Sequence, residues 1–102
     1  MTWDVLCRRL EADNRRKLIP MLNNLVLKEA EYLENNTQSR ARGLRKDEAL
    51  RSAREVYAGE VLQLAAEVEA SGELPDLEPE EILRQRRRPY VWAFVATWLD
   101  LD

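Results

Sequence analysis

The chain has 102 residues, of which 45% are hydrophobic, and it contains only three glycines and four prolines, a composition typical of one folded helical domain. Its formal charge of −3 excludes an overall basic field that would attract nucleic acid or an anionic membrane surface. Histidine is absent and cysteine occurs once, which removes the commonest general base, the commonest metal ligand and any thiolate zinc site.

We expect a single all-α domain over residues 1–102, an antiparallel helical bundle of four main helices plus a short aromatic C-terminal helix. The first helix is predicted from Trp3 to about Asn14, with Thr2 as its N-cap. Its apolar residues recur at spacings of three and four, and they are Trp3, Leu6, Cys7 and Leu10. Cys7 cannot form an internal disulfide, so we expect a buried, unreactive thiol.

Pro20 is expected to begin the second helix, because proline is tolerated in a first turn and disfavours helical geometry in the residue before it. This helix is predicted to end near Glu34. Its broad apolar face comprises Leu22, Leu25, Val26, Ala30 and Leu33. Residues 35–45, which are rich in Asn, Ser, Thr and Gln and include Gly43, are predicted to form a loop.

The third helix is predicted to be the longest, from a cap at Asp47 to about Ala70, where Ser71 and Gly72 end it. Apolar residues at spacings of three and four predict a core seam along its whole length. They are Leu50, Ala53, Tyr57, Val61, Leu64 and Val68.

A turn over residues 73–78 precedes a fourth helix, which Pro79 is expected to open. Its first turn carries Glu80 and Glu81 and its last turn carries arginines, which suits the helix dipole at both ends. Pro89 must interrupt or kink this helix, because it lacks an N–H and clashes with the preceding turn. The remaining segment, from Tyr90 to Leu101, is expected to be a fifth short helix or a bent continuation.

This C-terminal segment holds four of the seven aromatic residues, Tyr90, Trp92, Phe94 and Trp98. The residue types also suit a strand, but no other segment is predicted as a strand that could pair with it, so helix is favoured. A helix that is apolar on all sides is normally buried on all sides, and a small bundle has little surface for that, so we expect a homodimer. The predicted partner-binding residues are Trp92, Ala96, Leu99, Tyr90 and Trp98.

A charge pattern accompanies these helices. Residues 55–81 contain nine acids and no base, and Arg84, Arg86, Arg87 and Arg88 follow directly. If the third and fourth helices run antiparallel, the arginines lie beside the acidic half of the third helix, and charge pairing favours that topology. Glu67 and Glu69 lie in the last turns of the third helix, where the helix dipole favours cations. Their charges are then either compensated within the chain or form an acidic surface for a basic partner.

The same arginines are also the best candidates for nucleic-acid binding, because guanidinium groups suit phosphate and Trp92 or Tyr90 can stack on a base. A second basic stretch runs from Arg40 to Arg54. For metal chemistry, Glu31 and Glu34 supply one acidic pair on a helix face, but no second pair matches them. We therefore expect no metal and no cofactor.

Together these patterns predict a non-enzymatic protein-protein interaction module, an adaptor, inhibitor or antitoxin-like regulator, that acts as a dimer. A second hypothesis is a nucleic-acid-binding protein that uses either basic stretch, and a third is a carboxylate-metal enzyme. The N-terminus lacks the features of a signal peptide, and the longest apolar run is too short to cross a bilayer. We therefore expect a cytoplasmic protein that does not contact a membrane.

Overall fold

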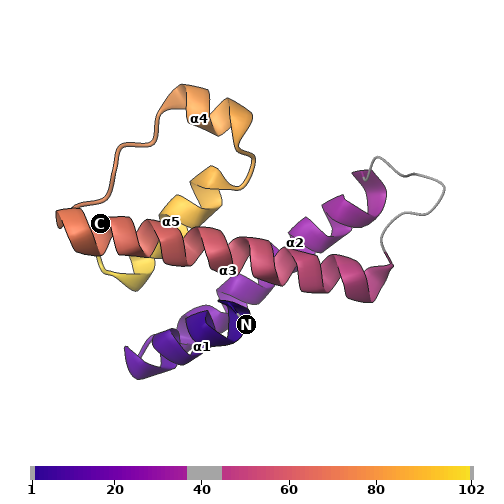
Figure 1. Ribbon diagram of the computed structural model, residues 1–102, viewed down its shortest axis with the longest axis horizontal. Coiled ribbons are helices and arrows are strands. Elements are labelled where there is room, and N and C mark those ends of the chain that lie inside the picture. The colour runs from indigo at the N-terminus through magenta and orange to yellow at the C-terminus, as the bar shows by residue number, and fades with distance from the viewer. Residues whose placement is uncertain (1, 37–44, 102) are drawn as a thin grey trace.

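The computed structural model describes residues 2–36 and 45–101, and all regular secondary structure in these ranges is helical (Figure 1). The elements are α1 (Thr2–Ala12), a 3₁₀ turn η1 (Arg16–Leu18), α2 (Ile19–Asn36), α3 (Lys46–Ser71), α4 (Pro79–Arg84) and α5 (Arg88–Trp98). The predicted all-α class is confirmed. The predicted loop over residues 35–45 lies mostly outside the described residues, and none of the described helices is both long and apolar enough to span a membrane.

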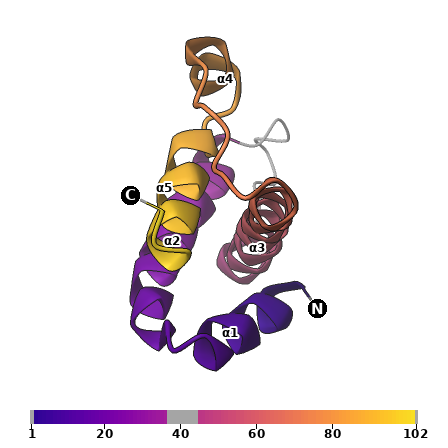
Figure 2. The same cartoon turned by 90° about the vertical axis from the view of Figure 1, so that its left-hand side faces the viewer.

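The helix α3 is the centre of the fold, because α1, α2 and α5 each pack against it (Figures 1 and 2). The helices α2 and α3 run in opposite directions and cross at an angle. Much of the core is one stripe along α3, formed by Ala49, Ala53, Tyr57, Ala58, Val61, Leu64, Ala65 and Val68. The many alanines in this stripe leave room for large side chains of neighbouring helices, chiefly Leu6, Leu10, Leu22, Phe94 and Trp98.

Local sequence signals account for some of the helix ends. Gly72 ends α3 in the left-handed conformation, with φ of 84°, and its N–H donates to the Val68 carbonyl at 2.7 Å. The expected cap of this helix is corrected: Arg45 occupies the N-cap position without a side-chain cap, and Asp47 lies in the first turn. There the negative charge still interacts favourably with the helix dipole.

The helix α4 lies apart from the rest of the molecule (Figure 2). It has only six residues and no buried residue, and α5 is its main neighbour. It ends at Arg84, so Arg86 and Arg87 lie between the helices rather than in its last turn. Pro89 lies in the first turn of α5, which begins at Arg88, and a first turn tolerates proline. The finer expectation of four main helices in an antiparallel bundle is therefore not confirmed.

Candidate interaction surface

The indole of Trp98 connects the end of α5 to the end of α1. Its Nε1 donates to Asp13 Oδ2 at 2.9 Å, and Arg15 Nε donates to the Trp98 carbonyl at 3.1 Å. The guanidinium of Arg9 lies 4.8 Å from the centroid of the indole ring, a cation–π distance. Trp98 is only 2% exposed, so its aromatic surface belongs to the core of this chain.

The other predicted partner-binding residues differ in exposure. Ala96 is buried, and Leu99 is half-buried against the core. Trp92 is also half-buried, and its Nε1 donates to the Pro75 carbonyl at 2.7 Å, which attaches the segment before α4 to α5. Tyr90 alone among the five is mostly accessible, at 53% exposure. Trp98 belongs to the core cluster that includes residues of α3, so packing of α5 against α3 covers it.

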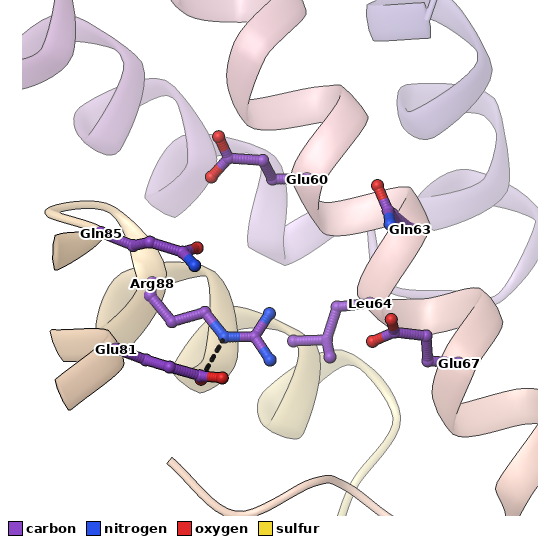
Figure 3. A pocket seen from close by; sticks show the side chains of 7 residues that line it. All are labelled: Glu60, Gln63, Leu64, Glu67, Glu81, Gln85 and Arg88. Carbon is purple, nitrogen blue, oxygen red and sulfur yellow. Dashed lines mark ion pairs between the residues drawn. The ribbon is translucent and has the colours of Figure 1, made fainter. Parts of the chain in front are cut away.

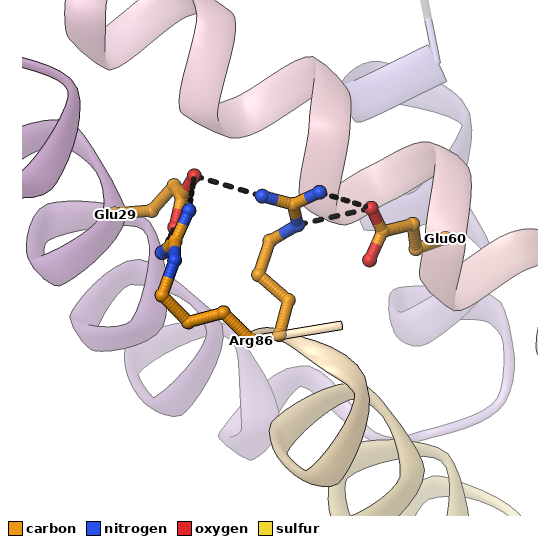
Figure 4. Close-up of polar contacts among 4 residues, drawn as sticks. Glu29, Glu60 and Arg86 are labelled. Carbon is orange, nitrogen blue, oxygen red and sulfur yellow. Dashed lines mark hydrogen bonds and ion pairs between the residues drawn. The ribbon is translucent and has the colours of Figure 1, made fainter. Parts of the chain in front are cut away.

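Two consecutive arginines between α4 and α5 bind a buried carboxylate on α2 (Figure 4). Glu29 is 3% exposed, and it accepts hydrogen bonds from Arg86 Nη2 at 3.1 Å and from Arg87 Nη1 at 3.0 Å. Arg87 also donates to Glu60 on α3, with Nε at 2.9 Å from Oε2. A buried carboxylate requires such partners, because the loss of hydration is otherwise uncompensated. We call Glu29, Glu60, Arg86 and Arg87 the Glu29 ion cluster, in which only Glu29 is buried.

The opposite charges of the Glu29 ion cluster stabilise one another. The hydrogen bond to Glu29 raises the pKa of Arg86. Burial lowers the pKa of Arg87, but its bonds and charge attraction to Glu60 and Glu29 outweigh this effect and raise the pKa overall. Burial and the nearby Glu29 charge raise the pKa of Tyr57 to about 12. Both arginines therefore stay charged and paired at neutral pH.

The internal pairing of arginines predicted from the charge pattern is thus present, but with different partners. Arg87 reaches Glu60 on α3 as expected, whereas the carboxylate shared by Arg86 and Arg87 is on α2. The missed residue, Glu29, had a sequence signal: it is the one acid within the apolar stripe of α2, three residues after Val26. An acid in such a position needs a cation from another element.

Arg88 takes part in a second, looser arrangement (Figure 3). Its Nε lies 3.5 Å from Glu81 Oε2, an ion pair too long and too poorly aligned for a good hydrogen bond. The pair borders a polar cavity of about 250 Å³ between α3 and the region of α4, also lined by Glu60, Gln63, Leu64, Glu67 and Gln85. Glu69 is not beside it, and pairs with Arg9 of α1 at 3.3 Å.

The predicted metal ligands do not converge. Glu31 is exposed and Glu34 is half-buried, both on α2. Within residues 2–36 and 45–101, no group of three or more acidic, histidine or cysteine side chains is arranged to hold a metal ion. Cys7 is partly buried, and burial, together with the charges of Asp4 and Glu11, raises the pKa of its thiol. A raised pKa disfavours the reactive thiolate.

The two basic stretches differ in the cations that they leave available to a ligand. In the first stretch, Arg86, Arg87 and Arg88 each form an ion pair. Arg84, the fourth arginine of this stretch, forms no ion pair with the described residues. Arg40 and the other residues of 37–44 lie outside the described part of the chain. The described basic residues at the start of α3 are Arg45, Lys46, Arg51 and Arg54, all exposed, and the Arg54 guanidinium lies 5.7 Å from the Trp3 ring centroid.

Exposed apolar side chains gather instead around the junction of α4 and α5. On α4, Ile82 is 41% exposed and Leu83 is 87% exposed. Beside the junction lies a groove of about 220 Å³ with mostly apolar walls, which we call the tyrosine groove. It is lined by Leu25, Lys28, Glu29, Tyr32, Tyr57, Arg86 and Tyr90. Leu83 was not among the contact residues predicted from the sequence, although an Ile-Leu pair in a helix too short to bury both residues is a usable signal.

No protein-family model, no curated protein and no solved structure matches this chain.

Proposed function

We propose that this chain is a non-enzymatic protein-protein interaction module that acts as a dimer and binds through the end of the molecule where α4 meets α5. The observation that carries the proposal is the contrast at this junction. Three of its arginines are paired with carboxylates, whereas Leu83 and Tyr90 remain more than half exposed. Exposed apolar and aromatic side chains beside a polar rim favour contact with protein.

The surface differs from the one proposed from sequence alone. Tyr90 is retained as a contact residue, while Ala96 and Trp98 contribute to the core. Leu83 and Ile82 are added, because α4 presents them to solvent. This arrangement supports an adaptor, inhibitor or regulator, whose work is done by binding alone.

A photo-crosslinking experiment tests the proposal. A photoreactive amino acid is introduced at position 83, and in a separate matched variant at position 27, because Leu27 is also exposed, at 51%, and lies on the opposite side of α2 from the groove. We expect protein adducts, including cross-linked copies of this chain, from position 83 and few from position 27. Equal yields from the two positions would contradict a dedicated surface.

Nucleic-acid binding remains the alternative, and it has its own measurement. Fluorescence anisotropy with labelled DNA and RNA at low and physiological salt detects any phosphate-driven binding, which weakens steeply with salt. Because Arg86 and Arg87 are engaged with Glu29, we expect no retention through the Arg84–Arg88 stretch at physiological salt. Tight binding that is lost in Arg84→Ala would replace the proposed function with this one.

A further inference from the structure

The helix α4 carries an exposed apolar side chain, and the tyrosine groove is a recess with mostly apolar walls. Leu83 projects from a helix that lies apart from the rest of the molecule, and the groove provides an apolar recess with room for an aliphatic side chain. Arg86 lines the groove and is only three residues after Leu83, so the projection and the recess are neighbours on one end of the molecule. A two-fold axis between two copies of the chain can therefore place Leu83 of each copy against the groove of the other.

The charges around the two surfaces are also complementary. On α4, Glu80 is three residues before Leu83, which places the acid and the leucine on one helix face. On α2, Lys28 is four residues before Tyr32 and lines the groove, so this recess has a cation at its rim. Both Glu80 and Lys28 are exposed, and neither forms an ion pair within the part of the chain that the structure describes.

We propose that α4 of one copy inserts Leu83 into the tyrosine groove of a second copy, with Glu80 beside Lys28, and that the second copy makes the same contact in return. This inference rests on the proposed function and assigns the surface of its dimer. A reciprocal contact buries Leu83 twice and closes the assembly at two copies. It also explains why a short helix without a core of its own carries the most exposed large apolar residue of the described chain.

Light scattering across a dilution series measures the mass of the wild type, of Leu83→Glu and of the matched control Leu27→Glu. The control loses the same apolar side chain and gains the same charge, but on the side of α2 away from the groove. We expect the dimer dissociation constant of Leu83→Glu to rise by at least about tenfold, because two buried leucines are lost, and that of the control to stay within about twofold. Because Leu83 is 87% exposed, the variant keeps its helical circular dichroism spectrum.

Charge exchange gives a second readout that a folding defect cannot imitate. Lys28→Glu alone brings two acids together in each contact, and Glu80→Lys alone brings two bases together, so each variant dimerises about tenfold more weakly. When the two variants are mixed, each contact again pairs an acid with a base. We expect the mixture to form heterodimers about as tightly as the wild type dimerises.

Three results would overturn the assignment. A wild-type dimer that is unaffected by Leu83→Glu would show that another surface pairs the copies, and the proposed interaction function would stand. Failure of the mixed charge variants to recover would exclude the Glu80–Lys28 contact. A wild type that remains monomeric at millimolar concentration would exclude the dimer itself, and the crosslinks from position 83 would then decide separately whether the chain binds another protein.

Discussion

The helices α4 and α5 are consecutive and both carry a proline in the first turn, yet α5 is seated in the core and α4 lies outside it. Apolar residues of α5 recur along one stripe, from Val91 through Val95 to Trp98, and this stripe is long enough to follow α3. The apolar residues of α4, Ile82 and Leu83, are adjacent in a six-residue helix and therefore diverge around its axis. Similar residue types are buried or exposed according to their periodicity and the helix length available.

The largest expected effect lies on the α5 side of this comparison. Trp98→Ala should lower the free energy of unfolding by about 3 to 5 kcal/mol, because it leaves a cavity in the core and removes the hydrogen bond to Asp13. Urea denaturation followed by circular dichroism measures this loss. A loss below about 1 kcal/mol would show that α5 contributes little to the core.

The next effect concerns the junction between the two helices. Replacing Arg86 and Arg87 with methionine leaves Glu29 buried without a cation, which should destabilise the chain by about 3 kcal/mol. Adding Glu29→Gln to this double variant removes the uncompensated charge, and should recover most of the loss. If Glu29→Gln fails to restore stability in urea denaturation, the arginines contribute through packing and not through their charge.

A smaller effect is expected at alkaline pH through Tyr57. Its pKa is raised from 10.0 to about 12, so above pH 10 the unfolded chain loses this proton while the folded chain keeps it. Stability is then lost as pH rises, and the Tyr57 contribution should lower the free energy of unfolding by about 1 kcal/mol between pH 9 and pH 11. Urea denaturation at both pH values should show a shallower decline for Tyr57→Phe. Equal declines for the wild type and Tyr57→Phe would contradict the raised pKa of Tyr57.

The smallest effect belongs to α4. At concentrations where the wild type is monomeric, Leu83→Ala should change the free energy of unfolding by less than about 0.5 kcal/mol, because the side chain is 87% exposed. Thermal denaturation of the two proteins side by side is sufficient to measure this. A loss as large as that of Trp98→Ala would remove the distinction between α4 and α5.

Residues that act locally made much of the fold predictable. Gly72 ends α3 and Pro79 begins α4, because a left-handed residue and a fixed φ impose their effect on the adjacent turn whatever lies nearby. Spacings of three and four likewise identified the buried face of α3. Asp47, the predicted N-cap, lies two residues after the observed N-cap Arg45, since a helix can begin without a side-chain cap.

The candidate site was less predictable because its contacts depend on how helices cross. The charge pattern along the chain shows that the arginines have acids to pair with, but it does not show that Glu29 of α2 lies closer to Arg86 than the acids of α3. Similarly, the aromatic content of α5 does not reveal that the indole N–H of Trp98 donates a hydrogen bond to Asp13 at the end of α1. These pairings follow from interhelical angles, which periodicity leaves open.

The Trp98 contact also affects the order of folding. Its hydrogen bond to Asp13 joins residues 85 positions apart, and the bonds of Arg86 to Glu29 join residues 57 positions apart. Closing such long loops costs more chain entropy than bringing together α2 and α3, which are neighbours along the chain. We therefore expect the α2–α3 pair to form first and α5 to dock after the rate-limiting barrier, so that substitutions in α5 accelerate unfolding and leave the folding rate nearly unchanged.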